Sequence, residues 1–151
     1  GDLGNASRYL VVALQLYEAL GYELWVARTR WSIARLSLAA GNFREAEHRL
    51  RDAIHDLEAK GLQNDTADAK LDLAEALLML GRIEEVEALC GEVAFFYREA
   101  GLVTGALTAA SFLKEAASRR VLSREHIDVV RHYLVAARED PDLRFAPPTQ
   151  I

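Results

Sequence analysis

Cysteine is almost absent from this chain, and so are stretches long and apolar enough for a membrane. The single cysteine, Cys90, excludes an internal disulfide and any zinc site built from several thiolates. The uncharged run Gly101–Leu113 has only 13 residues, whereas a membrane-spanning helix needs about 20 mostly apolar residues. The first residues lack both the basic and the apolar segment of a signal peptide. These absences predict a cytoplasmic protein with no membrane partner.

Proline is scarce and confined to one end of the chain. The three prolines are Pro141, Pro147 and Pro148. Everything before Pro141 is therefore free of proline, and its richness in Ala, Leu, Glu and Arg favours helix almost everywhere. The net charge is -5, from 18 basic and 23 acidic side chains. Because an acidic balance disfavours binding to a phosphate backbone, we expect no direct nucleic-acid partner.

Glycines and packing residues recur at a fixed spacing along the chain. Two glycine series interleave, each offset from the other by half a repeat. This pattern is typical of a chain of helical hairpins, because glycine ends a helix with a positive φ at little cost. Small and large apolar residues recur in the same register, which indicates an internal repeat. The glycine series are Gly1, Gly41, Gly81 and Gly21, Gly61, Gly101; the packing series are Ala6, Ala46, Val86; Leu10, Leu50, Cys90; Ala13, Ala53, Val93; and Tyr17, Leu57, Tyr97.

Two of these units resemble the tetratricopeptide repeat (TPR). One combines Ile33-Ala34 with the segment Gly41–Ala46, and the other combines Leu73-Ala74 with Gly81–Val86. The resemblance covers about residues 1–138 and implies an all-α fold, a right-handed solenoid of antiparallel helical hairpins. The usual repeat has about 34 residues, so a repeat of 40 implies helices that are nearly one turn longer.

The repeat predicts about seven antiparallel helices. The first would be the second helix of a hairpin without its partner, so its stripe Leu10, Ala13, Leu14 and Tyr17 would lack a cover on one side. Either the chain was cut from a longer protein, which we favour, or another chain covers this face. The expected helices span residues 4–20, 22–40, 43–59, 65–80, 83–99, 102–119 and 123–138.

The last repeat departs from the pattern. Val121 stands where a glycine is expected, and His126 replaces a small residue. Tyr133 takes the position of Ala53 and Val93. Because solenoids end in atypical repeats, this unit is interpreted as a C-terminal cap, with Ser123 as the N-cap of its helix. Residues 139–151 form a tail that contains proline and leaves the helix.

The segment Phe95–Pro148 is similar to the C-terminal TPR region of a group of bacterial regulatory proteins. The chain uses 15 Arg against 3 Lys, which suits a GC-rich bacterial genome. The resemblance therefore implies a part of a larger bacterial regulatory or signalling protein.

Few residues are arranged for catalysis or metal binding. His48, Asp52 and His55 lie on one expected helix, but no His-x-x-x-His or His-Glu-x-x-His pattern occurs, and surface histidines are the favoured interpretation. Cys90 occupies the position of Leu10 and Leu50, which indicates a buried thiol. Neither a P-loop nor a Gly-x-Ser-x-Gly motif is present. We therefore expect no enzymatic activity, no cofactor and no metal.

The family's groove positions point to one face of the expected solenoid. In TPR proteins the first helix of each hairpin lines a concave groove, where partners usually bind. Arg28, Trp31 and Arg35 lie at i, i+3 and i+7, hence on one side of a helix. Trp31 either anchors a partner together with Arg35 or fills space against the preceding helix. The expected partner-binding residues are Arg28, Trp31, Arg35, Asp68, Leu71, Asp72, Glu75, Ser111, Glu115 and Arg119.

Two functional hypotheses follow from these patterns. The first is a protein–protein interaction module whose helical-repeat groove binds a peptide or protein segment. The alternative is a structural or assembly module that stacks or dimerises through the uncovered face of its first helix, which makes a homodimer possible.

Overall fold

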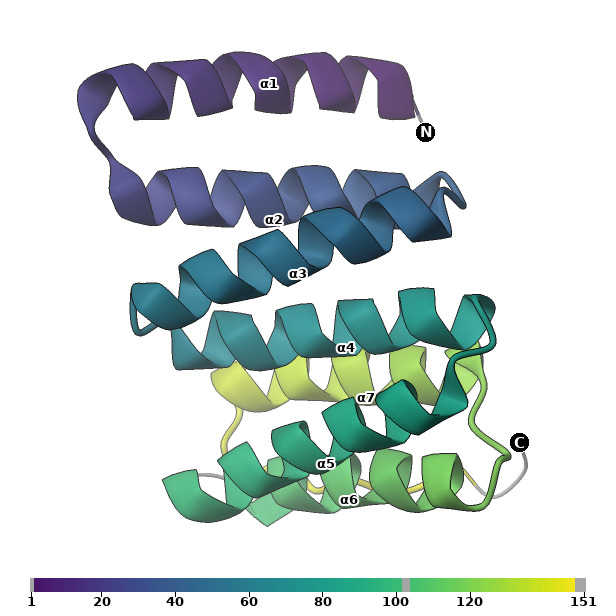
Figure 1. Cartoon of the computed structure of the whole chain (residues 1–151). Coiled ribbons are helices and arrows are strands. Elements are labelled where there is room, and N and C mark those ends of the chain that lie inside the picture. Colours follow the sequence, from purple (N-terminus) through teal and green to yellow (C-terminus); the bar gives the residue numbers. More distant parts are fainter. Residues whose placement is uncertain (1, 102–103, 149–151) are drawn as a thin grey trace. The chain divides into compact units, whose positions relative to one another are not determined.

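The computed structural model describes residues 2–101 and 104–148, and most of these residues are helical (Figure 1). No strand occurs within this described part, which confirms the predicted all-α fold. The ends of the helices agree with the expected ends to within two residues, although the expected start of the sixth helix at residue 102 lies outside the described residues. The helices are α1 (Leu3–Leu20), α2 (Glu23–Ala39), α3 (Phe43–Ala59), α4 (Gln63–Met79), α5 (Ile83–Ala100), α6 (Thr104–Ser118) and α7 (Arg124–Glu139).

The chain divides into two compact units. The N-terminal unit, Gly1–Leu80, contains α1 to α4, and the C-terminal unit, Gly81–Ile151, contains α5 to α7 and the tail. Within each unit, consecutive helices run antiparallel, and those of the N-terminal unit are joined by short turns (Figure 1). The expected division into a repeat domain of residues 1–138 and a tail of residues 139–151 stays a prediction. None of the helices in the described ranges has both the length and the apolar character needed to cross a membrane.

The helix ends follow the predicted glycine pattern, with one exception. The N–H of Asn42 donates to the carbonyl of Ser37 at 3.0 Å, a bond that closes the last turn of the helix. After α6, Val121 donates to Ala116 at the same distance, but Arg120 takes the left-handed conformation, with a φ of 59°. The cap geometry therefore persists without glycine. The glycines with positive φ, between 60° and 78°, are Gly21, Gly41, Gly61, Gly81 and Gly101.

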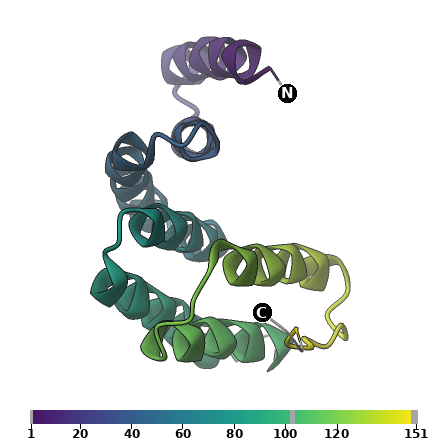
Figure 2. The ribbon, with the colours of Figure 1, turned by 90° about the vertical axis from the view of Figure 1, so that its right-hand side faces the viewer.

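Burial in the N-terminal unit increases from α1 towards α4. On α3, the stripe Leu50, Ala53 and Leu57 is at most 1% exposed. The middle of α4, residues 71–77, is buried on every side, whereas α1 contains no buried residue. Figure 2 shows α1 at the end of the series α1 to α4, next to α2. The predicted stripe on α1 thus lacks a full cover, as expected for a helix that packs against one neighbour.

The start of α7 carries the predicted cap. The hydroxyl of Ser123 accepts a hydrogen bond from the N–H of His126, and the Nδ1 atom of His126 accepts one from the N–H of Ser123 at 3.1 Å. This reciprocal pair satisfies two backbone donors that the first turn of a helix otherwise leaves without partners. His126, which replaces a small residue of the repeat, therefore has a local structural role.

The tail leaves α7 as predicted but packs back onto the C-terminal unit (Figure 2). The Tyr133 hydroxyl donates a hydrogen bond to the carbonyl of Leu143 at 2.8 Å. The ring of Phe145 lies 5.1 Å from the ring of Tyr133 and 5.6 Å from that of Phe112. Gly105 makes room for this arrangement, because a Cβ atom at that position would lie 1.8 Å from the Tyr133 hydroxyl. The bulky Tyr133 is thus matched by a glycine on α6.

Candidate functional site

The predicted face of α2 is assembled around Trp31. The indole Nε1–H of Trp31 donates a hydrogen bond to Asp72 of α4 at 2.8 Å. The guanidinium of Arg35 lies 5.7 Å from the centre of the Trp31 ring, and its Nε lies 3.6 Å from Asp72. A cation above an indole face is favourable, and the carboxylate fixes both partners. Trp31 is half-buried, so it packs between the helices while part of it reaches the surface.

A second pair of the same kind lies two turns earlier on α2. The guanidinium of Arg28 lies 5.8 Å from the ring of Trp25, and its Nε is 2.7 Å from Asp65 of α4. Trp25 also stacks on Tyr17 of α1, with 5.9 Å between ring centres. Arg28 was predicted from its helical spacing, whereas Trp25 and Asp65 were not. The sequence contained a signal that could have found both residues, because Trp25 and Asp65 occupy equivalent positions in successive repeats.

The two arginines form a regular basic surface. Arg28 and Arg35 are seven residues apart, which corresponds to roughly 10 Å along a helix. Their side chains are 44% and 54% exposed, although each is held by a carboxylate. A guanidinium has five N–H donors in a rigid fork, so donors remain on the exposed side. We call Trp25, Arg28, Trp31 and Arg35, with Asp65 and Asp72 behind them, the α2 face. It can hold an anionic group at two points and an apolar group between them.

Three of the expected groove residues contribute little open surface. Leu71, Asp72 and Glu75 are only 1%, 2% and 3% exposed. Asp72 acts instead as the acceptor that positions Trp31 and Arg35. Periodicity along α4 places these residues on the expected face, and their side chains are buried. Asp68, the fourth expected groove residue on α4, is half-buried.

Comparisons with protein-family models, with curated proteins and with solved structures give no match to this chain. The TPR resemblance therefore stays a prediction from the sequence pattern. One structural observation agrees with that pattern. Glu18 pairs with Arg30 at 3.1 Å, and the pair one repeat later, Glu58 and Lys70, is 3.2 Å apart. The packing of α1 on α2 and of α3 on α4 thus shares an ion pair in register.

The remaining expected residues belong to the C-terminal unit. Ser111, Glu115 and Arg119 lie on or just after α6 and are exposed. Arg119 pairs with Glu115 at 2.8 Å, one helical turn apart. Exposed pairs of this kind contribute only about 0.3–0.5 kcal/mol to stability. This group stays a predicted site, with its charges arranged along one helix.

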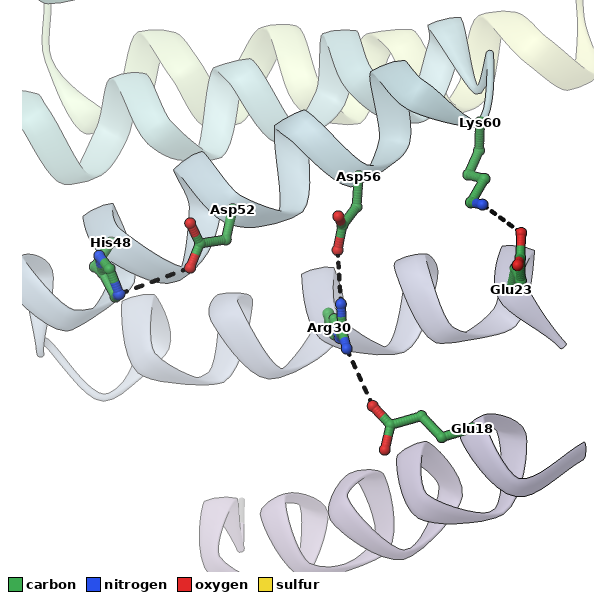
Figure 3. A network of polar contacts seen from close by, with 7 residues as sticks. All are labelled: Glu18, Glu23, Arg30, His48, Asp52, Asp56 and Lys60. Atoms are coloured by element: carbon green, nitrogen blue, oxygen red, sulfur yellow. Dashed lines mark hydrogen bonds and ion pairs between the residues drawn. The ribbon is translucent and has the colours of Figure 1, made fainter. Parts of the chain in front are cut away.

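A polar network lies on the other side of α2, between α1 and α3 (Figure 3). Arg30 bridges Glu18 of α1 and Asp56 of α3, at 3.1 Å and 3.0 Å. The hydrogen bond that Arg30 donates to Asp56, and to a lesser degree the one it donates to Glu18, raises the pKa of the Arg30 guanidinium. Lys60, the residue directly after α3, pairs with Glu23 of α2, and this lowers the pKa of the Glu23 carboxyl.

These residues line an open depression of about 360 Å³. Its charges are of both signs and pair with one another. The ion pairs that line the depression therefore connect α1, α2 and α3. They leave no excess of one charge that would attract a ligand.

The histidine cluster is solvent-exposed. His48 and Asp52 approach within 3.6 Å, and their side chains are 81% and 71% exposed. Within the described ranges, no three His, Cys, Asp or Glu side chains are grouped so that they could hold a metal ion. His48 and Asp52 thus form a solvated pair on α3.

Cys90 fills a core position on α5, where it is 1% exposed. Burial, with a smaller contribution from Glu87, raises the pKa of the thiol from 9.0 to about 12. A thiol that stays protonated is a poor nucleophile. We therefore expect a thiol-exchange reagent at about pH 9 to modify Cys90 only as fast as the protein unfolds. Labelling of the native protein at the rate of a free thiol would contradict this burial.

The same shift predicts a pH dependence of stability. Between about pH 9 and pH 12 the unfolded chain releases the Cys90 proton while the folded chain keeps it. The unfolded state then binds fewer protons, so the free energy of unfolding falls as pH rises through this window. The wild type should show a steeper fall than Cys90→Val, which has no thiol to titrate.

Proposed function

We propose that this chain is a protein–protein interaction module of the TPR type, a right-handed solenoid of helical hairpins within a larger bacterial regulatory protein. Support for the repeat comes from the regularly spaced glycine turns and from the ion pair Glu18–Arg30, which recurs one repeat later as Glu58–Lys70. Binding rather than catalysis is the proposed role, since the one thiol has a raised pKa and is buried.

The α2 face is the proposed binding surface. The observation that carries this proposal is the fixed position of Trp31 and Arg35, which Asp72 holds from the neighbouring helix. Side chains that are ordered before binding lose less conformational entropy when a partner arrives. Trp and Arg are also the residues most enriched at binding hot spots. Two neighbouring Arg–Trp pairs are therefore a suitable anchor for a binding partner.

The chemistry of the α2 face defines the class of partner. Two exposed guanidinium groups roughly 10 Å apart match two carboxylates on a peptide at i and i+7 of a helix. The Trp31 indole between them matches an apolar or aromatic side chain. We propose a peptide segment with acidic residues on both sides of an apolar residue.

A peptide library tests this proposal. Random peptides selected on the immobilised wild-type protein should be enriched in Asp and Glu around an apolar residue. For a selected peptide, Trp31→Ala should raise the dissociation constant more than about thirty-fold, because a desolvated aromatic anchor contributes about 2 kcal/mol or more. Arg35→Gln should weaken binding and reduce its dependence on salt.

Phe95→Ala is the matched control. Phe95 is 55% exposed and lies beneath Arg98, with 5.2 Å between the guanidinium and the ring centre, so it reproduces an exposed aromatic–arginine pair on another helix. The dissociation constant of the Phe95→Ala protein for a selected peptide should equal that of the wild type. Equal binding by Trp31→Ala with unchanged helix content, or selected peptides without acidic residues, would exclude the α2 face as proposed.

A further inference from the structure

The tail crosses an aromatic site between α6 and α7, within the C-terminal unit (Figure 2). The ring of Phe145 lies 5.6 Å from that of Phe112 on α6 and 5.1 Å from that of Tyr133 on α7. The Tyr133 hydroxyl also donates a hydrogen bond to the carbonyl of Leu143 at 2.8 Å. The two helices thus hold a phenyl ring and the main-chain carbonyl two residues before it. We call Gly105, Phe112 and Tyr133 the aromatic site.

The walls of the aromatic site are positioned by the two helices. The ring of Phe112 also lies 5.4 Å from the ring of His126, which is 6% exposed and takes part in the cap of α7. At Gly105, an added Cβ would be 1.8 Å from the Tyr133 hydroxyl and 3.1 Å from the carbonyl of Leu143. A residue without a side chain therefore allows both the Tyr133 ring and the main chain of a bound segment to approach α6 closely.

The equivalent positions on α4 have a different chemistry. Gly105 and Phe112 follow Asp65 and Asp72 by one repeat, and those two carboxylates hold the arginines of the α2 face. On α6 the same positions carry a glycine and a phenyl ring. The last repeat therefore replaces two contacts to cations by a surface that is suited to an aromatic side chain.

The tail is bound in the way that an extended peptide ligand is bound. Residues 143–148 have no regular secondary structure. Exposure alternates along them, because Leu143 and Phe145 are half-buried, whereas Arg144 and Ala146 are exposed. In an extended segment successive side chains point to opposite sides, so every second residue reaches the helices. The tail thus shows which kind of segment fits the aromatic site.

We propose that the aromatic site is a second peptide-binding site, for an extended Leu-x-Phe segment of another protein, and that the tail of this chain occupies it as an autoinhibitory segment. Leu143 follows closely on the end of α7 at Glu139, so the tethered tail has an effective concentration in the millimolar range or above. A free segment binds only to those molecules whose tail is released, and its apparent affinity falls in proportion. The aromatic site shares no residue with the α2 face, so this proposal does not depend on the function proposed for that face.

A fluorescent peptide with the sequence Asp140–Pro148 tests this proposal. In the full-length Phe145→Ala protein, the tail no longer fills the space between the two rings. Fluorescence anisotropy should therefore detect binding of the peptide with a dissociation constant below about 1 mM. The wild type should bind the peptide at least ~10-fold more weakly, because its own tail competes. Arg144→Ala is the matched control, since it changes an exposed neighbour of Phe145 and should bind the peptide as weakly as the wild type.

Two further measurements locate the bound peptide. The protein that combines Phe112→Ala with Phe145→Ala should lose binding, and a peptide that carries Phe145→Ala should not bind to any of these proteins. Circular dichroism should show that each variant keeps its helix content. If Phe145→Ala lowers the helix content, Phe145→Leu takes its place, because leucine keeps apolar bulk but lacks the ring.

Four results would overturn the proposal. The first is that the folded Phe145→Ala protein does not bind the peptide at about 1 mM, and the second is that it binds no more tightly than the wild type. The third is binding that persists after Phe112→Ala, which would place the peptide elsewhere. The fourth is a wild type that dimerises in sedimentation equilibrium while Phe145→Ala stays monomeric, which would assign the site to the tail of a second copy.

Discussion

Leu50→Ala should lower the free energy of unfolding by about 2–5 kcal/mol, and Leu10→Ala should lower it by less than about half as much. The two leucines hold the same position in the repeat, one on α3 and one on α1. Leu50 is fully buried, so its removal loses apolar burial and leaves a cavity. Leu10 is half-exposed, so less burial is lost and solvent can fill the space.

Urea unfolding of both variants measures this difference. The protein should be dilute, at about 1 µM, so that association through α1 does not add stability. Equal losses for the two variants would show that α1 is covered even in the monomer, which contradicts the burial pattern of the N-terminal unit. The slope of free energy against urea should stay constant if each variant unfolds in the same way.

Gly105→Ala should make the protein less stable than Gly91→Ala by roughly 3 kcal/mol. A Cβ at Gly105 would lie 1.8 Å from the Tyr133 hydroxyl and 3.1 Å from the carbonyl of Leu143. Tyr133 cannot retreat without breaking its hydrogen bond to Leu143 and its contact with Phe145. At Gly91, on α5, an added Cβ meets nothing within 4 Å, so alanine should stabilise the helix there by about 0.5–1 kcal/mol.

A double substitution identifies the cause of the loss. Tyr133→Phe removes the hydroxyl that is closest to the new Cβ, so Gly105→Ala should cost less in that background than in the wild type. The free energies of unfolding of the four proteins, measured in urea, provide the interaction energy. Additive effects would mean that Gly105 is not required by Tyr133.

Several local features could be predicted because they depend on neighbours in sequence. The cap at Ser123 depends on residues three positions apart. The end of α6 could not be predicted from its sequence neighbours alone. Val121 occupies the expected glycine position, but the helix ends at Ser118 and the left-handed residue is Arg120. Helix propensities are too weak to determine the end of a helix to within one residue. The sequence pattern alone therefore does not predict where α6 ends.

The candidate site could be predicted in part. The 3.6-residue period of a helix is enough to place Arg28, Trp31 and Arg35 on one face. Asp72 was expected beside them as an open groove residue, but it is 2% exposed and accepts the indole hydrogen bond. That role depends on a side chain 41 residues away on another helix, and periodicity within α4 contains no information about it.

By itself the sequence determined the helices, their order, the turns between them and the register of the repeat, because helix propensity and the positive φ of glycine act over a few residues. Tertiary structure alone decided which equivalent positions are buried. Leu10 and Leu50 have the same local pattern, yet one is half-exposed and the other is inaccessible. Burial, the Trp31–Asp72 bond and the room for Tyr133 beside Gly105 all depend on distances between helices, which arise only when the helices pack.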